Sequence, residues 1–234
     1  MNKSARLTVA VLAAITAMSC TSIVSFASTR TDTVIEENVN VGGWAISSGK
    51  STSLSANPEA ESAFKKATAN LAGVNYQAIC VLGTQLVAGT NYAILCRSTV
   101  VYPDAQPEIK IMYIYEDLEG NTEIIGFQTI IGKQIPGGFT ANSGKLSLNK
   151  NKSVKKIYQK AMNGLTGVSY TPKAYLGSQV VAGTNYMILC RSRVVYPNAP
   201  YQWSLVTVNK DLDGKASLVE IETLELGNMD DETL

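Results

Sequence analysis

The sequence contains one segment twice, and this internal repeat limits the possible folds more than any other feature. Residues 85–103 recur as residues 179–197, with 16 of 19 positions identical and a constant offset of 94. Glycines outside this segment keep the same register, so the duplication extends well beyond it. A repeat of this kind predicts two copies of one small structural unit in a single chain.

The limits of the repeat divide the chain into six predicted parts. With 234 residues, the chain has room for two small domains, which we place at residues 42–128 and 137–226 with a linker at 129–136. A signal peptide at 1–27 and a polar leader at 28–41 precede them. Residues 227–234 form an acidic tail that we expect to be mobile.

The first 27 residues have the pattern of an export signal. Lys3 and Arg6 form a basic start, an apolar run follows, and Ser-Phe-Ala at 25–27 resembles a cleavage site. The apolar run is too short to cross a bilayer, so we predict a secreted or otherwise extracytoplasmic protein without a membrane span. A lipid anchor at Cys20 is the alternative.

The charge and the residue types argue against several functions. Without Lys3 and Arg6, 18 of the 20 basic residues remain against 19 acidic ones, which gives no basic surface for nucleic acid. The chain contains no histidine, the most common general base and metal ligand. We therefore predict no enzyme activity, no catalytic residues, no metal and no cofactor.

Three cysteines follow the signal, which is an odd number for an exported protein. Cys96 and Cys190 occupy equivalent repeat positions within apolar strands. We expect small buried core residues, while a disulfide between Cys80 and Cys96 across a hairpin stays open.

The hydrophobic periodicity changes from helical to extended within each unit. Pro58 begins an amphipathic stripe that ends at Gly73, and the second unit repeats the stripe up to Gly167. Four β-type runs follow the first stripe, at residues 76–82, 90–101, 109–115 and 123–127. The pattern predicts an α+β class, with one helix packed across an antiparallel β-sheet in each of two tandem domains.

The connection between the first two predicted strands resembles the Gln-x-Val-x-Gly loop of the cystatin family. The segment is Gln85-Leu86-Val87-Ala88-Gly89 in one unit and Gln179-Val180-Val181-Ala182-Gly183 in the other, each followed by Asn-Tyr after one residue. The loop lies one helix and one strand after a diglycine, and the resemblance covers almost all of residues 40–226. It implies two tandem cystatin-like domains.

This resemblance implies reversible inhibition of papain-like cysteine proteases by a three-part wedge. The two loops would enter the protease cleft, and the glycine leaders would lie along the substrate subsites. The leaders are Val41-Gly42-Gly43 and Pro136-Gly137-Gly138. The third part in animal cystatins is a Pro-Trp pair in the last hairpin, which here contains residues 117–121 or 211–215 and lacks the pair. Trp203 aligns with Ile109 at the start of a strand, where we expect it to pack on the sheet.

Two functions therefore compete. The paired loops favour an inhibitor whose partner is a papain-like cysteine protease. The missing Pro-Trp pair favours a non-inhibitory module that binds or adheres to another protein on the same scaffold. Inhibition of papain separates the two.

Overall fold

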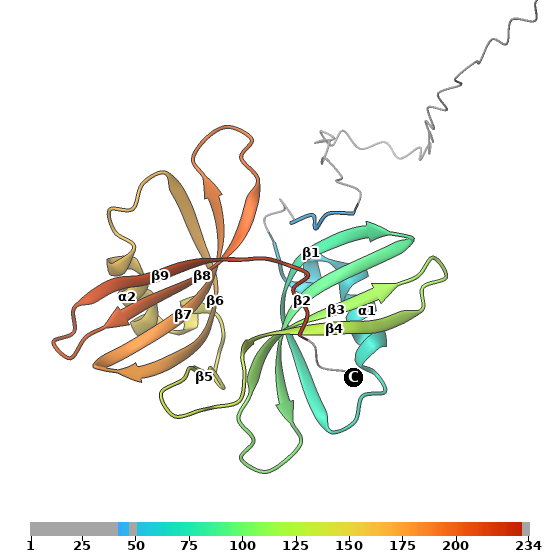
Figure 1. Cartoon of the computed structure of the whole chain (residues 1–234), viewed down its shortest axis with the longest axis horizontal. Coiled ribbons are helices and arrows are strands. Elements are labelled where there is room, and N and C mark those ends of the chain that lie inside the picture. Colours follow the sequence, from blue (N-terminus) through green and yellow to red (C-terminus); the bar gives the residue numbers. More distant parts are fainter. Residues whose placement is uncertain (1–41, 47–50, 231–234) are drawn as a thin grey trace, which may run out of the picture. The chain divides into compact units, whose positions relative to one another are not determined.

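The computed structural model describes residues 42–46 and 51–230 (Figure 1). The 3-10 turns are Leu54–Ala56 and Leu148–Lys150, and the helices are α1 (Pro58–Thr68) and α2 (Lys152–Ala161). The strands are β1 (Val74–Val87), β2 (Gly89–Val100), β3 (Glu108–Glu116), β4 (Thr122–Ile131), β5 (Thr140–Ala141), β6 (Val168–Val181), β7 (Gly183–Val194), β8 (Tyr201–Lys210) and β9 (Ala216–Leu224).

The strands form two antiparallel sheets in which neighbours in sequence are neighbours in space. One sheet has the order β1-β2-β3-β4 and the other β5-β6-β7-β8-β9 (Figure 1). In both sheets the long first hairpin, β1–β2 or β6–β7, has a single residue between its strands. Two register shifts interrupt each of these hairpins, and they fall at equivalent positions of the two repeats.

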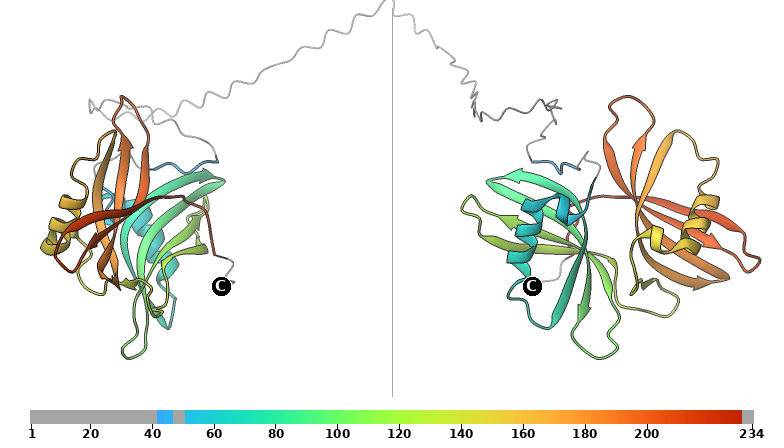
Figure 2. Two further views of the ribbon diagram at one scale, coloured as in Figure 1. Left: turned by 60° about the vertical axis from the view of Figure 1, so that its left-hand side comes forward. Right: turned by 180° about the vertical axis from the view of Figure 1, so that it is seen from behind.

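Each helix covers one face of its own sheet (Figure 2). Pro58 occupies the first turn of α1, where its missing N–H costs no hydrogen bond. Ala63 and Phe64 of α1 pack against Ile94 and Met112. In the second repeat, Val154 and Tyr158 of α2 pack against β7 and β8. Side chains alternate between the two faces of each strand, and each helix buries those on one face of its sheet.

The opposite faces of the two sheets share a single hydrophobic core. Leu82 and Tyr113 of the first sheet lie in one buried cluster with Leu176, Leu189 and Trp203 of the second. Trp203 is fully buried, and its indole Nε1 donates a hydrogen bond of 2.6 Å to the carbonyl oxygen of Leu82. The expected packing role of Trp203 is confirmed, although its contacts extend to the other repeat.

The predicted α+β class with two separate helix-on-sheet domains is wrong. The described chain is mostly β, with two helices of only 11 and 10 residues beside nine strands in two sheets. The physical reason is visible in β2, where residues 93–96 are apolar at every position and fully buried. Such a run indicates cover on both faces of a sheet, whereas one helix per sheet explains only one face.

Beyond the last strand, part of the expected mobile tail is attached to the first sheet. The backbone N–H of Asp230 donates to the carbonyl oxygen of Phe127, and the Asp230 carboxylate accepts a hydrogen bond of 2.8 Å from the N–H of Thr129. Met229 lies against Gly126. Residues 231–234 lie outside the described part. None of the described helices has the length and apolarity that a membrane crossing requires.

Candidate functional site

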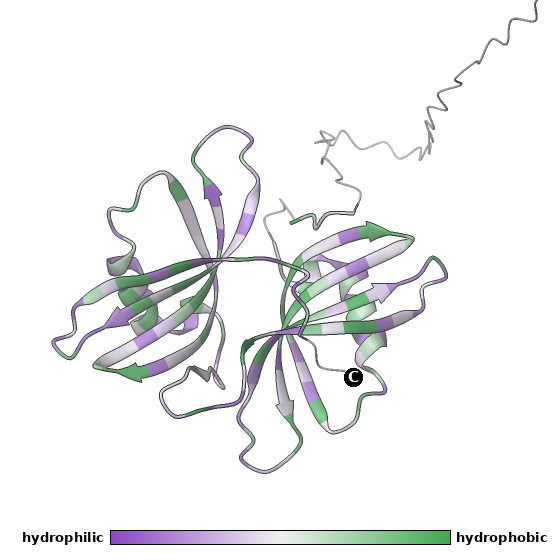
Figure 3. Cartoon of the chain, viewed as in Figure 1, coloured by the Kyte–Doolittle hydropathy of each residue, from purple (hydrophilic) through white to green (hydrophobic). Residues whose placement is uncertain are grey.

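The Gln-x-Val-x-Gly segments form the tips of the two long hairpins. Val87 pairs with Gly89 across the first tip, and Val181 pairs with Gly183 across the second. The apolar side chains here are exposed rather than packed, with Leu86 50% and Val180 83% accessible. The end of β1 is accordingly hydrophobic in Figure 3. Four apolar side chains are therefore exposed to solvent at the tips: Leu86, Val87, Val180 and Val181.

Glycine is required at the tip because a second hairpin lies against it. Gly89 has a φ of +129°, and a Cβ atom there would lie 2.3 Å from the carbonyl oxygen of Glu116. Gly183 has a φ of +113°, with a Cβ 2.2 Å from the carbonyl oxygen of Lys210. A side chain at either position would separate the first hairpin from the β3–β4 or β8–β9 turn.

The conserved geometry of the repeat also includes a glutamine that connects the diglycine leader to the hairpin. Gln85 Nε2 donates to the carbonyl oxygen of Gly42 at 2.9 Å, and its Oε1 accepts from Asn91 Nδ2 at 2.7 Å. Gln179 Nε2 donates to Gly137 in the same way at 2.8 Å, and Asn185 orients it. The asparagine fixes the amide so that its NH₂ group faces the leader.

Strand pairing continues this contact between leader and hairpin. Ala45 and Thr84 exchange two backbone hydrogen bonds, of 2.7 and 3.0 Å. Thr140 of β5 pairs with Ser178 in the second repeat. Gly43 and Gly138 are half-buried, while Pro136 is exposed. Val41, the remaining predicted leader residue, lies outside the described residues.

The last hairpin of each repeat has an exposed leucine at the turn where animal cystatins carry the Pro-Trp pair. Leu118 is 85% exposed at the β3–β4 turn, and Leu212 is 84% exposed at the β8–β9 turn. Asp117 closes the first of these turns by accepting hydrogen bonds from the Asn121 side chain and backbone, which hold the pKa of its carboxyl below the ordinary value. The leucine therefore projects from a defined turn.

A tyrosine connects the two turns of the first repeat. Tyr115 Oη donates to the carbonyl oxygen of Ala88 at 2.6 Å. In the second repeat, Asn209 replaces this tyrosine and donates to Asn185 Oδ1 at 2.8 Å. We define the hairpin edge of each repeat as the diglycine leader, the first hairpin tip and the last hairpin turn. In both repeats the first hairpin is hydrogen-bonded to the leader and lies against the last turn at its tip glycine.

The three described cysteines are buried in the sheets, away from the hairpin edges. Cys80, Cys96 and Cys190 are all buried free thiols, and burial raises the pKa of each to about 12, so none is a nucleophile at neutral pH. Cys80 faces the core between the sheets and Cys96 faces α1, and both are free, so the disulfide that the sequence left open is absent from the structure. The described residues contain no group of three or more potential metal ligands.

Sequence reasoning identified the tips and the leaders but missed three other contributors. These are the asparagines that orient the glutamines, the leucines of the last turns and Tyr115. The asparagines and the leucines could have been found from the repeat itself. Gln and Asn recur six residues apart in both repeats, and Asp-Leu-x-Gly recurs in both turns. Tyr115 has no counterpart in the second repeat and gave no such signal.

The fold and the hairpin edges together define a two-sheet repeat protein with two equivalent hairpin edges. Comparison with known proteins gives no narrower class, because no family model and no curated protein matches the chain.

Proposed function

We propose that the protein is an exported, reversible inhibitor of papain-like cysteine proteases that inserts one or both hairpin edges into a substrate cleft. The single observation that carries this proposal is the Gln85–Gly42 hydrogen bond and its repeat, Gln179–Gly137. These bonds hold the glycine turn of the leader beside an apolar hairpin tip. Two adjacent projecting segments of this kind could enter a substrate cleft together.

The energetics of the edge are adequate for useful affinity. Full burial of an aliphatic side chain contributes about 1.5 to 3 kcal/mol, so Leu86, Val87 and Leu118 together offer several kcal/mol to a partner. The absent aromatic anchor costs about 2 to 4 kcal/mol by comparison with typical interfaces. An exposed leucine on the last turn offsets part of this loss. The hydrogen-bonded leader lowers the entropy that binding must remove.

Inhibition of papain by mature residues 28–234 tests the proposal. The parent should inhibit with a sub-micromolar constant, and a Val87→Asp/Val181→Asp variant should lose inhibition because a charge replaces an apolar contact at both tips. The matched control is Val101→Asp/Val195→Asp, which changes the same residue type once per repeat at exposed positions beyond the other strand ends. The control should inhibit like the parent.

Single variants separate the two edges. If both repeats bind, Val87→Asp alone and Val181→Asp alone should each halve the number of protease molecules bound per chain. A folded parent that leaves papain fully active at about 10 µM, equivalent to an affinity weaker than about −7 kcal/mol, would refute the inhibitor proposal. That result would favour the non-inhibitory module that binds another protein.

A further inference from the structure

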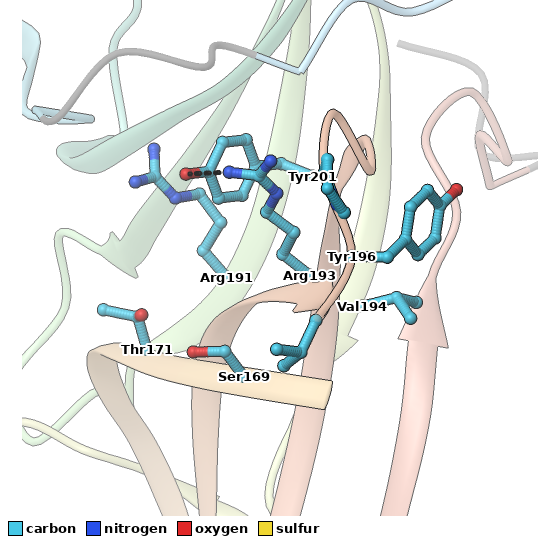
Figure 4. A pocket seen from close by; sticks show the side chains of 9 residues that line it. Ser169, Thr171, Arg191, Arg193, Val194, Tyr196 and Tyr201 are labelled. Carbon is cyan, nitrogen blue, oxygen red and sulfur yellow. Dashed lines mark hydrogen bonds between the residues drawn. The ribbon is translucent and has the colours of Figure 1, made fainter. Parts of the chain in front are cut away.

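A second candidate site lies at the opposite strand ends of the second repeat. A pocket of about 480 Å³ covers the start of β6, the end of β7 and the start of β8. Its polar lining comes from Ser169 and Thr171 on β6, Arg191 and Arg193 on β7, and Tyr201 on β8, with Tyr196 among the apolar residues of one wall (Figure 4). This pocket is separate from the hairpin edges.

The pocket has a concentrated positive charge. The Cζ atoms of Arg191 and Arg193 lie 4.3 and 5.1 Å from the ring centroid of Tyr201. A hydrogen bond from Arg193 lowers the pKa of Tyr201, and the charges of Arg191 and Lys173 lower it further. Burial and the neighbouring Arg191 charge lower the pKa of Lys173. Among the ion pairs of the described residues, none involves Lys173 or Arg193.

Hydroxyl groups face the arginines from the neighbouring strand. Ser169 is directly opposite Arg193, and Thr171 is directly opposite Arg191, in the register of β6 and β7. All four residues line the pocket, and in Figure 4 the two guanidinium groups lie near Tyr201 while the two hydroxyls lie on the other side. Guanidinium groups on one side of a pocket and hydroxyls on the other can bind the oxygens of a phosphate or sulfate between them.

The first repeat lacks this arrangement, so the scaffold alone does not explain it. At the offset of 94, Thr99 replaces Arg193, Ile79 replaces Lys173 and Pro107 replaces Tyr201. Arg97 matches Arg191, but its guanidinium donates to the carbonyl oxygens of Asn142 and Gly144 at 3.0 and 2.9 Å. The basic cluster is therefore specific to the second repeat.

We propose that this pocket binds a phosphate or sulfate group, with Arg193 and the Ser169 and Thr171 hydroxyls as direct donors and Lys173 and Arg191 as additional positive charge. A volume of about 480 Å³ exceeds the needs of a single oxyanion and falls in the range of pockets for small organic ligands. The remaining space beside Tyr196 suits a sugar ring that carries the anion, and a free inorganic ion is the other source of the same chemistry.

NMR titration of ¹⁵N-labelled residues 28–234 tests this site at constant ionic strength, with chloride replaced stepwise by sulfate, phosphate or glucose 6-phosphate. Saturable shifts should appear at Ser169, Thr171 and Tyr201. The Arg193→Thr variant introduces the residue of the equivalent first-repeat position and should weaken binding about 10- to 100-fold, because a charge-assisted hydrogen bond is lost. The control Lys156→Gln removes an exposed charge on α2 and should bind like the parent.

Further variants keep the test decisive. If Arg193→Thr perturbs the spectrum beyond the pocket, Arg193→Lys serves instead, since it retains the charge but loses the planar donor fork. Glucose 6-phosphate that binds more than tenfold tighter than phosphate, with the difference removed by Tyr196→Ala, identifies a sugar-borne anion. Equal affinities identify a free ion. Shifts that do not saturate up to 50 mM, or an unchanged affinity in both Arg193 variants, would overturn the proposal.

Discussion

The indole of Trp203 provides a quantitative test of the core shared by the two sheets. Leu82 lies in a register shift of the β1–β2 ladder, between the paired residues Val81 and Gly83, and its carbonyl oxygen accepts from Trp203 Nε1. In the second repeat, the equivalent carbonyl of Leu176 accepts from the backbone N–H of Asn142. The first repeat thus depends on the second for a bond that the second obtains locally.

Replacing Trp203 by phenylalanine removes the donor and leaves most of the aromatic surface. A buried carbonyl without a partner costs about 1 to 3 kcal/mol, so Trp203→Phe should lower the free energy of unfolding by that amount. Trp203→Ala should cost more, about 3 to 5 kcal/mol, because it also creates a cavity in the core. Trp44→Phe is the matched control. Its indole is only partly buried, packs against Tyr113 with the two rings tilted by 54°, and makes no hydrogen bond within the described residues.

Urea unfolding followed by far-ultraviolet circular dichroism measures these differences without depending on tryptophan fluorescence. Because the sheets share a core, parent and variants should unfold in one transition, and Trp203→Phe should shift its midpoint more than Trp44→Phe does. Two separate transitions, or a Trp203→Phe cost below about 0.5 kcal/mol, would refute the reasoning, since changes of that size are typical of surface substitutions.

Two further predictions concern the hairpin tips and the thiols. In thermal unfolding, Gly89→Ala should destabilise the protein more than Gly73→Ala. Both glycines have positive φ, but only a Cβ atom at Gly89 would meet a neighbouring backbone. Equal decreases in the unfolding temperature would contradict the close approach of the two turns. Cys80 and Cys96 have folded-state pKa values raised from 9.0 to about 12, so folding favours the protonated thiols. Stability should be complete below pH 9 and fall as the pH rises toward 12, and thiol reagents at pH 8 should label the cysteines only as the protein unfolds.

Several elements of the fold could be predicted from the sequence alone. The predicted strand at 109–115 is β3 (Glu108–Glu116), and the predicted helix start at Pro58 is the first residue of α1. The helix ends at Thr68, before the glycine that was taken as its terminator, because residues 69 and 70 form a turn and residues 71 and 72 have no regular secondary structure. Local patterns thus located elements well and their ends less well.

The packing of one sheet on the other could not be predicted, because the sequence pattern did not show that the helix-free faces of the two sheets cover each other. Val100 alternates with Cys96 along β2, a pattern that predicts a position on the helix-covered face, yet Val100 is exposed at the end of the strand. The contact of Trp203 with Leu82 joins residues 121 positions apart. Such contacts depend on how two sheets meet, and hydrophobic periodicity describes only one element at a time.

The parts of the hairpin edge that belong to a local sequence motif could be predicted. The parts that depend on contacts between distant residues could not. The tip residues follow from the hairpin sequence, but the Gln85–Gly42 bond joins residues 43 positions apart. Leu118 was overlooked because a Pro-Trp pair was sought at that turn. Its exposed position gives the turn an apolar group of a different type.

The burial of both sheet faces determines where this protein can bind a partner. Each sheet has a helix on one face and the other sheet on the opposite face, so apolar strand residues are already used for folding. The exposed large apolar side chains consequently concentrate at strand ends and turns, with Val219 within β9 as an exception. Most of the apolar surface that a partner could contact therefore lies at the ends of the strands. The hairpin edges lie at one end of the strands of each repeat, and the basic pocket lies at the other end in the second repeat.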